Sequence, residues 1–200
     1  MDAFDADALI YAAIPGHPLG RRIAALFPAR PVSGSGGRAG VGSVLLLPEV
    51  LAKPLKDGEL AALKTLSGFL ARLDLRPVDR ATAQLATVLG ARYNLRAADA
   101  VHLATAVAMG ARRFITSNSR DFGAAIKEID ITFPADLAEP AALRPSSARA
   151  GMRHAPRVPP ARALAVALLA EVDHRLLRCS PRPDATTLAV RNRRCPQSAP

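Results

Sequence analysis

The chain has 200 residues, half of them hydrophobic, and a formal net charge of +10 at pH 7. This length predicts one domain with a sizeable core, and no apolar run reaches the roughly 18 residues of a membrane span. The segment Met1–Asp5 lacks the basic start of a signal peptide, so we expect a cytoplasmic protein with no membrane partner. Cys179 and Cys195 fit no metal-ligand or disulfide pattern and are expected to be reduced thiols.

The positive charge is concentrated in the last third of the chain. Residues 1–139 hold 16 Lys and Arg against 14 Asp and Glu, whereas residues 140–200 hold 11 against 3. The second segment also has 9 of the 17 prolines and no aromatic residue, so it lacks the means to build its own core. We therefore predict a folded domain over 1–138 and a basic Pro/Arg-rich C-terminal tail over 139–200, largely disordered, with one helix at about 160–178.

Short strands are predicted to alternate with helices along the domain. In chain order the prediction is a strand running into a helix over 3–10, a helix over 18–27, a flexible glycine-rich loop over 31–42, a helix over 44–52 capped by Ser43, a helix over 57–73, a strand over 74–78, helices over 81–93 and 95–106, the latter closed by Gly110, and strands over 112–118 and 129–133. This alternation is typical of an α/β fold with a mostly parallel sheet. In such sheets the chemistry lies beyond the carboxyl ends of the strands.

Several acidic and amide side chains occupy positions that could meet at that edge. Asp5 lies at the end of the first strand, and Asn118 and Asp121 lie at and just after the end of the strand over 112–118. Glu49 is inside the helix that follows the glycine-rich loop, and Asp99 is in the first turn of its helix. The sequence therefore predicts that these residues converge on one site.

Clustered carboxylates of this kind favour a bound divalent cation. The carboxylates repel one another, and their pKa values rise unless a positive charge compensates. Magnesium prefers oxygen ligands and is commonly held by a few carboxylates together with waters and substrate phosphates. Because such a cation polarises a phosphodiester and supplies hydroxide near neutral pH, the cluster is suited to phosphodiester hydrolysis.

Four separated motifs then resemble one known family. The stretches FDADALI, GSVLLLPEVL, LRAADAVHLATA and FITSNSRDF occur in the order and spacing of the PIN-domain ribonucleases. They look most like the VapC-type toxins of bacterial toxin–antitoxin modules, and the resemblance covers about residues 2–134. It implies a PIN-like α/β/α sandwich, an endoribonuclease that depends on Mg²⁺ or Mn²⁺, an RNA substrate, a cognate antitoxin protein and a homodimer. The antitoxin could cover the site by inserting an arginine among the acids.

The resemblance also carries over residue by residue. Asp5, Glu49 and Asp99 match the first three metal-binding acids of the family, and Asp121 matches the acid that many members place just before Phe122. These four acids are the expected catalytic residues.

One position departs from the family pattern and two others have supporting roles. Some members carry an aspartate where this chain has Asn118, which offers the metal an oxygen without a charge, so Asp121 could take over that role. Ser43 and Asp7 occupy positions where the family often has a small polar residue supporting the first acid or the waters of the metal.

Each acid also has a simpler explanation. Asp5 at a strand end could cap the following helix, and Asp99 in a first turn is stabilised by free N–H groups and the helix dipole. Asp121 suits an ordinary polar turn. Glu49 is the one charge in the run VLLLPEVLA, which favours a functional role for it.

Basic side chains near the acids are open to two interpretations. His102 lies three residues after the third acid on the same helical face, where a packing role is favoured over a general base because metal-bound water needs no histidine. Arg112, Arg113 and Arg120 are expected to border the site, and these three and Arg96 either contact RNA phosphates or are solvated surface.

Two other functions compete with the nuclease. The sequence FDADAL also fits the Asp-x-Asp pattern of haloacid-dehalogenase-type phosphatases, with Asp5 as nucleophile, Asp7 as acid and Thr116 as a second motif. That scheme also needs a lysine and a further pair of acids. The chain offers only Lys127 and the acids that follow it, in an unsuitable setting, and Glu49 and Asp99 stay unexplained. A PIN-like RNA-binding protein whose site no longer turns over is the third interpretation, supported by Asn118.

Overall fold

The computed structural model describes residues 1–27 and 38–140, so the predicted tail helix over about 160–178 and both cysteines lie outside the described residues. Its elements, in chain order, are β1 (Asp2–Phe4), α1 (Ala6–Ala13), α2 (Pro18–Ala24), β2 (Gly40–Ser43), α3 (Leu46–Asp57), α4 (Leu60–Leu70), β3 (Leu73–Arg76), α5 (Arg80–Tyr93), α6 (Ala97–Ala108), β4 (Arg113–Ile115), β5 (Asp130–Thr132) and the 3₁₀ turn η1 (Pro134–Asp136). The predicted alternation of strands and helices is confirmed.

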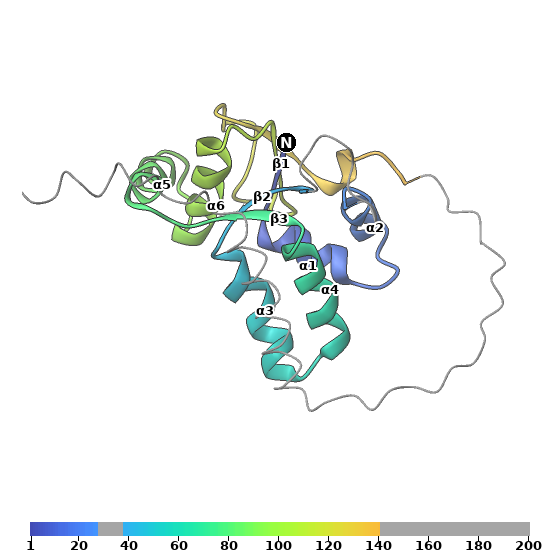
Figure 1. The fold of residues 1–200 in the computed structure, drawn as a ribbon. Coiled ribbons are helices and arrows are strands. Elements are labelled where there is room, and N and C mark those ends of the chain that lie inside the picture. The colour runs from blue at the N-terminus through green and yellow to red at the C-terminus, as the bar shows by residue number, and fades with distance from the viewer. Residues whose placement is uncertain (28–37, 141–200) are drawn as a thin grey trace, which may run out of the picture.

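The five strands form one sheet in the order β3-β2-β1-β4-β5, and every pair of neighbours is parallel. The first strand of the chain therefore lies at the centre, between β2 and β4. The parallel arrangement puts the carboxyl ends of all five strands at one edge of the sheet. The predicted α/β class with a mostly parallel sheet is confirmed, and Figure 1 shows the helices arranged around this sheet.

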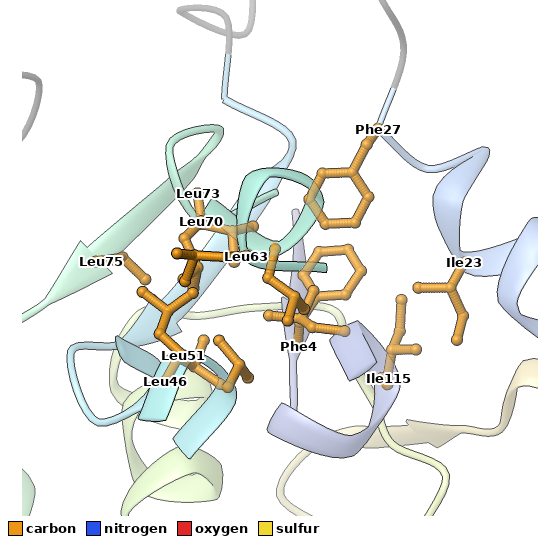
Figure 2. Close-up of a cluster of buried hydrophobic side chains, with 14 of the residues drawn as sticks. Phe4, Ile23, Phe27, Leu46, Leu51, Leu63, Leu70, Leu73, Leu75 and Ile115 are labelled. Carbon is orange, nitrogen blue, oxygen red and sulfur yellow. The ribbon is translucent and has the colours of Figure 1, made fainter. Parts of the chain in front are cut away.

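Helices cover both faces of the sheet because successive strand residues point to opposite sides. Phe4 and Ile115 join the cluster built with α1 to α4, while Ala3 and Phe114 join the cluster built with α5 and α6. Figure 2 shows the first cluster, in which the rings of Phe4 and Phe27 pack with centroids 4.8 Å apart. The central strands β1 and β4 thus bury apolar side chains on both faces of the sheet.

The predicted glycine-rich loop is wrong at its carboxyl end, where residues 40–43 form the buried strand β2. A Cβ at Gly40 would lie 2.4 Å from the backbone oxygen of Asp2, and one at Gly42 would lie 2.4 Å from a methyl carbon of Leu46. The two glycines thus allow β1 and the start of α3 to pack closely against β2. Glycine is depleted in strands, so the composition of this segment favoured a loop.

The predicted cap at Ser43 is also wrong, since Ser43 ends β2 and α3 begins three residues later at Leu46. The Ser43 hydroxyl instead accepts a hydrogen bond of 3.2 Å from the backbone N–H of Leu45, within the turn that joins strand and helix. Helix ends elsewhere follow local chemistry: Asn94 (φ 54°) closes α5 in the left-handed region, and Gly110 (φ 61°) follows α6.

Among residues 1–27 and 38–140, no helix combines the length and apolar character needed to span a bilayer.

Candidate functional site

The carboxyl ends of β1 and β4 bring two aspartates against one threonine. Asp5 follows β1 directly, is 4% exposed, and accepts hydrogen bonds from the Ala6 N–H (2.9 Å) and from the Thr116 hydroxyl (2.8 Å). Asp7 lies in the first turn of α1 and accepts a 3.0 Å hydrogen bond from the Ser117 N–H. The Thr116 hydroxyl is also 3.4 Å from an Asp7 oxygen. Asp5 therefore both caps α1 and lies in an acidic pair, so its two predicted roles are compatible.

This acidic pair is unfavourable when both members are ionised. Burial first, and then the negative charge of Asp7, raise the pKa of Asp5 to about 7, although His102 and the hydrogen bond from Thr116 oppose the rise. Burial likewise raises the pKa of Asp7, against the hydrogen bonds from Ser117 and the start of α1. At neutral pH the pair therefore favours either a shared proton or a neighbouring cation.

The turn after β4 holds the second pair of predicted site residues. The amide of Asn118 donates to an Asp121 carboxylate oxygen at 2.9 Å, while its own oxygen accepts the Asp121 backbone N–H at 3.2 Å. The Asn118 N–H in turn donates to the Thr116 hydroxyl at 3.0 Å. Arg120 lies beside this turn with its Nε 3.6 Å from Asp121, and its side chain is 83% exposed. Asn118 thus orients Asp121 and, through Thr116, links it to the two aspartates that follow β1.

Helices α3 and α6 contribute the remaining acids. Glu49 is in the first turn of α3, and its Oε2 lies 2.5 Å from Nε2 of His102. Asp99 is in the first turn of α6 as predicted, and burial raises its pKa, with further contributions from the negative charges of Asp121 and Glu49. His102 and Arg96 act in the opposite direction on the pKa of Asp99. Glu49 and Asp121 are therefore near enough to Asp99 for their charges to affect its pKa.

The donor chemistry of this acidic site, defined as Asp5, Asp7, Glu49, Asp99 and Asp121, fits a hard divalent cation. Three of its carboxyl groups have raised pKa values, a state that a bound cation relieves. Within residues 1–27 and 38–140, however, no three His, Cys, Asp or Glu side chains are placed as ligands of one metal ion. Magnesium requires only one or two carboxylates when waters and substrate phosphates complete its shell. The residues therefore suit such a shared site rather than a closed protein cage.

Two of the predicted cationic neighbours lie elsewhere. Arg113 begins β4 and binds both carboxylate oxygens of Asp2, which begins β1, at 3.0 and 2.6 Å. Arg112 donates its backbone N–H to the Met1 carbonyl at 2.9 Å. Both arginines are therefore at the amino-terminal edge of the sheet, and the expectation that they border the site is wrong. Arg96 and Arg120 are at the site.

Sequence reasoning missed how the site is supported. The sequence points to Thr116 only through the phosphatase pattern, yet its buried hydroxyl contacts both aspartates that follow β1 and the turn after β4. A threonine near the carboxyl end of the predicted strand over 112–118 is the signal that could have indicated this role. The expected supporting role of Ser43 stays a prediction. Among the described residues its hydroxyl forms a hydrogen bond only with the Leu45 N–H and none with an acid of the site.

One comparison with known proteins gives a match. The PIN domain family matches residues 3–127, a span that includes every side chain of the acidic site. Members of that family are in general metal-dependent nucleases. No curated protein and no solved structure matches the chain significantly.

Proposed function

The chain belongs to the PIN domain family, and on that premise we propose that it is a Mg²⁺-dependent endoribonuclease acting as the toxin of a type II toxin–antitoxin system. The convergence of acids from β1, α3, α6 and the β4 turn supports this proposal most directly. The buried His102 links the two halves of that group, since it influences the pKa of both Asp5 and Asp99. Carboxylates repel one another, so their assembly at one edge of the sheet needs a reason, and cation binding supplies it.

In the proposed reaction carboxylates from among Asp5, Glu49 and Asp99 would hold Mg²⁺ or Mn²⁺ together with waters and the RNA phosphate, with Asn118 and Asp121 at the side of the β4 turn. The cation, when bound, polarises the RNA phosphodiester and lowers the pKa of water enough to supply a nucleophile near neutral pH. Hydrogen bonds within the protein orient two of the carboxylates before a cation binds. Thr116 orients the carboxylate of Asp5, and Asn118 orients that of Asp121.

The RNA would approach the carboxyl edge of the sheet. Arg96 and Arg120 are at the site, and the side chain of Arg120 is 83% exposed, so both can pair with phosphates. Such contacts hold the strand without reading its sequence, so the target RNA is set by other features of the surface.

Cleavage of a mixed RNA pool by the full chain tests the enzyme activity. We expect cleavage with Mg²⁺ or Mn²⁺, none with EDTA, and a loss of at least about 100-fold in Asp99→Asn, as for the removal of a strong electrostatic group. Asp130→Asn is the matched control, because Asp130 is an exposed aspartate at the other edge of the sheet. A folded wild-type protein that binds RNA and cleaves none with any divalent cation would instead support the RNA-binding alternative suggested by Asn118.

The toxin role rests on the resemblance of the four motifs to VapC-type proteins. We expect that induced expression of the chain stops bacterial growth, and that co-expression of a small protein encoded beside it restores growth. Asp99→Asn should be harmless under the same induction. Light scattering of the purified protein tests the expected homodimer, and fractionation tests the expected cytoplasmic location. Growth arrest that persists in Asp99→Asn would argue against a toxic nuclease.

The contacts of Thr116 with Asp5 and Asp7 would also suit the phosphatase alternative, but an acid that this alternative needs after Lys127 is engaged elsewhere. Glu128, one of the acids after Lys127, binds Arg92 and the hydroxyl of Tyr93 at 2.8 and 2.7 Å. That alternative also leaves Asp99 without a function.

A further inference from the structure

A buried histidine, His102, is hydrogen-bonded to one of the acids of the site, Glu49. The His102 side chain is 1% exposed, while that of Glu49 is 34% exposed, and the two are joined between Nε2 and Oε2 at 2.5 Å. An ionised carboxylate can only accept, so the ring must donate this hydrogen bond. The other ring nitrogen, Nδ1, is buried and has no hydrogen-bond partner in the part of the chain that the structure describes. Within that part of the chain, the ring therefore makes its hydrogen bond to Glu49 alone.

We propose that His102 is a positioning residue that fixes the orientation of Glu49 for cation binding in the acidic site. This inference rests on the proposed nuclease function. It differs from the packing role expected from sequence, because the ring acts through a specific partner. It also differs from a general base, because its Nε2 is already engaged with Glu49.

The arrangement suits this role for three reasons. Glutamate has three side-chain torsions, and a partly exposed one loses considerable freedom when it binds an ion. A single directional donor from a rigid, buried ring removes that freedom in advance. The bond engages only Oε2, and Oε1 has no donor among the described residues, so one oxygen stays available to a cation. Glu49 and His102 come from different helices, α3 and α6, so the bond also fixes the position of Glu49 relative to Asp99.

Manganese binding by the full chain, measured by calorimetry without RNA, tests the inference independently of cleavage. Outer partners of metal ligands typically contribute 10- to 100-fold in affinity, so we expect His102→Leu to weaken Mn²⁺ binding about 10-fold or more. His102→Gln places an amide donor near the position of Nε2 and should recover most of the loss. In cleavage assays the Leu variant should lower kcat with little change in KM for RNA, because Glu49 is not expected to bind the substrate strand.

A double-mutant cycle separates positioning from packing. If His102 acts through Glu49, His102→Leu should cause less than about a twofold further loss of Mn²⁺ affinity in a Glu49→Ala background. A packing role would weaken both backgrounds equally. Thr105→Val is the matched control, since Thr105 is buried one turn along α6 and, among the described residues, its hydroxyl bonds only to the Val101 carbonyl. It should leave Mn²⁺ affinity unchanged.

The outcomes distinguish this inference from the proposed function. If wild type binds Mn²⁺ and cleaves RNA while His102→Leu does both equally well, the positioning role is wrong and the nuclease stands. The positioning role is also wrong if His102→Gln is as weak as His102→Leu, a comparison that decides the question where binding to Glu49→Ala is too weak to measure. If the wild type itself neither binds Mn²⁺ nor cleaves RNA, both the proposed function and the inference fail.

Discussion

Thr116 and Asp5, 111 positions apart in the chain, are joined by a hydrogen bond of 2.8 Å at the carboxyl edge of the sheet. The donor is fully buried and the acceptor is 4% exposed, so water screens the contact little. The same hydroxyl lies 3.4 Å from Asp7 and accepts the Asn118 N–H. One side chain thus connects the acids that follow β1 with the turn that carries Asp121.

The metal-free protein is expected to lose stability as the pH rises through about 7. The pKa of Asp5 is 3.8 in an ordinary setting and about 7 in the folded chain, so folding favours its protonated form. Its contribution is fully present below about pH 4 and is lost as the pH rises through 7, an effect on the order of a few kcal/mol. Thermal unfolding should therefore show Tm falling by roughly 5–10 °C between pH 5 and pH 8.

Asp5→Asn isolates that contribution, because the amide is neutral at every pH in this range. The variant should show a distinctly smaller fall in Tm than the wild type, although Asp7 and Asp99, whose pKa values are also raised, retain part of it. Adding Mn²⁺ at pH 8 should raise the Tm of the wild type again and should raise the Tm of the variant less. Identical pH profiles for the two proteins would contradict the assignment.

Asn118→Asp is expected to lower the stability of the metal-free protein and to strengthen cation binding. The substitution removes the amide that donates to Asp121 at 2.9 Å and places a second carboxylate there. Without metal at pH 8 the loss should be about 1 kcal/mol, while the rise in Tm on adding Mn²⁺ should exceed that of the wild type. Asn118→Ala serves as control, since it removes the same donor without adding charge. An equal response to Mn²⁺ in the Asp and Ala variants would exclude residue 118 from the cation site.

Two arginine variants should distinguish a structural arginine at one edge of the sheet from an RNA-binding arginine at the other. Arg113→Ala breaks the bidentate pair with Asp2 and is expected to lower stability by about 1–3 kcal/mol without changing RNA affinity at the carboxyl edge. Arg120→Ala should leave Tm nearly unchanged, because its side chain is 83% exposed, and should weaken RNA binding and reduce its salt dependence. Filter binding at several salt concentrations and thermal unfolding measure both. The reverse pattern would show that the RNA binds elsewhere.

Gly40→Ala is expected to destabilise the fold by more than about 2 kcal/mol. Its Cβ would lie 2.4 Å from the backbone oxygen of Asp2 and 2.7 Å from a ring carbon of Phe4, so β1 and β2 could not pair as they do. Gly68→Ala in α4 is the control: nothing lies within 4 Å of its added Cβ, and alanine in a helix should stabilise by about 0.5–1 kcal/mol. Urea unfolding of both variants tests the contrast.

Much of this architecture could be predicted from local signals. Strand and helix alternation predicted the parallel sheet, and the edge at which its chemistry lies follows from that topology. Asp5 at a strand end and Asp99 in a first turn were placed correctly because these positions depend on neighbouring residues alone. Helix ends at Asn94 and Gly110 follow the same local chemistry.

What could not be predicted depends on contacts between distant segments. β2 is a strand only because β1 and β3 pair with it on either side, and its glycines favoured a loop when taken alone. The position of Arg113 could in fact be predicted, because Arg113 lies at the start of the predicted strand over 112–118 and hence at the edge opposite the carboxyl ends of the parallel strands. The bond between His102 and Glu49 joins residues 53 positions apart, and neither position indicates the other.

The central place of β1 in the sheet has a consequence for how the protein is synthesised. β1 is synthesised before β2, with which it can pair early, whereas its other neighbour β4 begins more than 100 residues after β1. The Asp5 N–H bonds to the Ile115 carbonyl, and the Thr116 hydroxyl follows it in the chain. A nascent chain that ends before β4 therefore lacks an assembled acidic site. Assembly of the site therefore waits for the synthesis of β4 and of the turn that follows it.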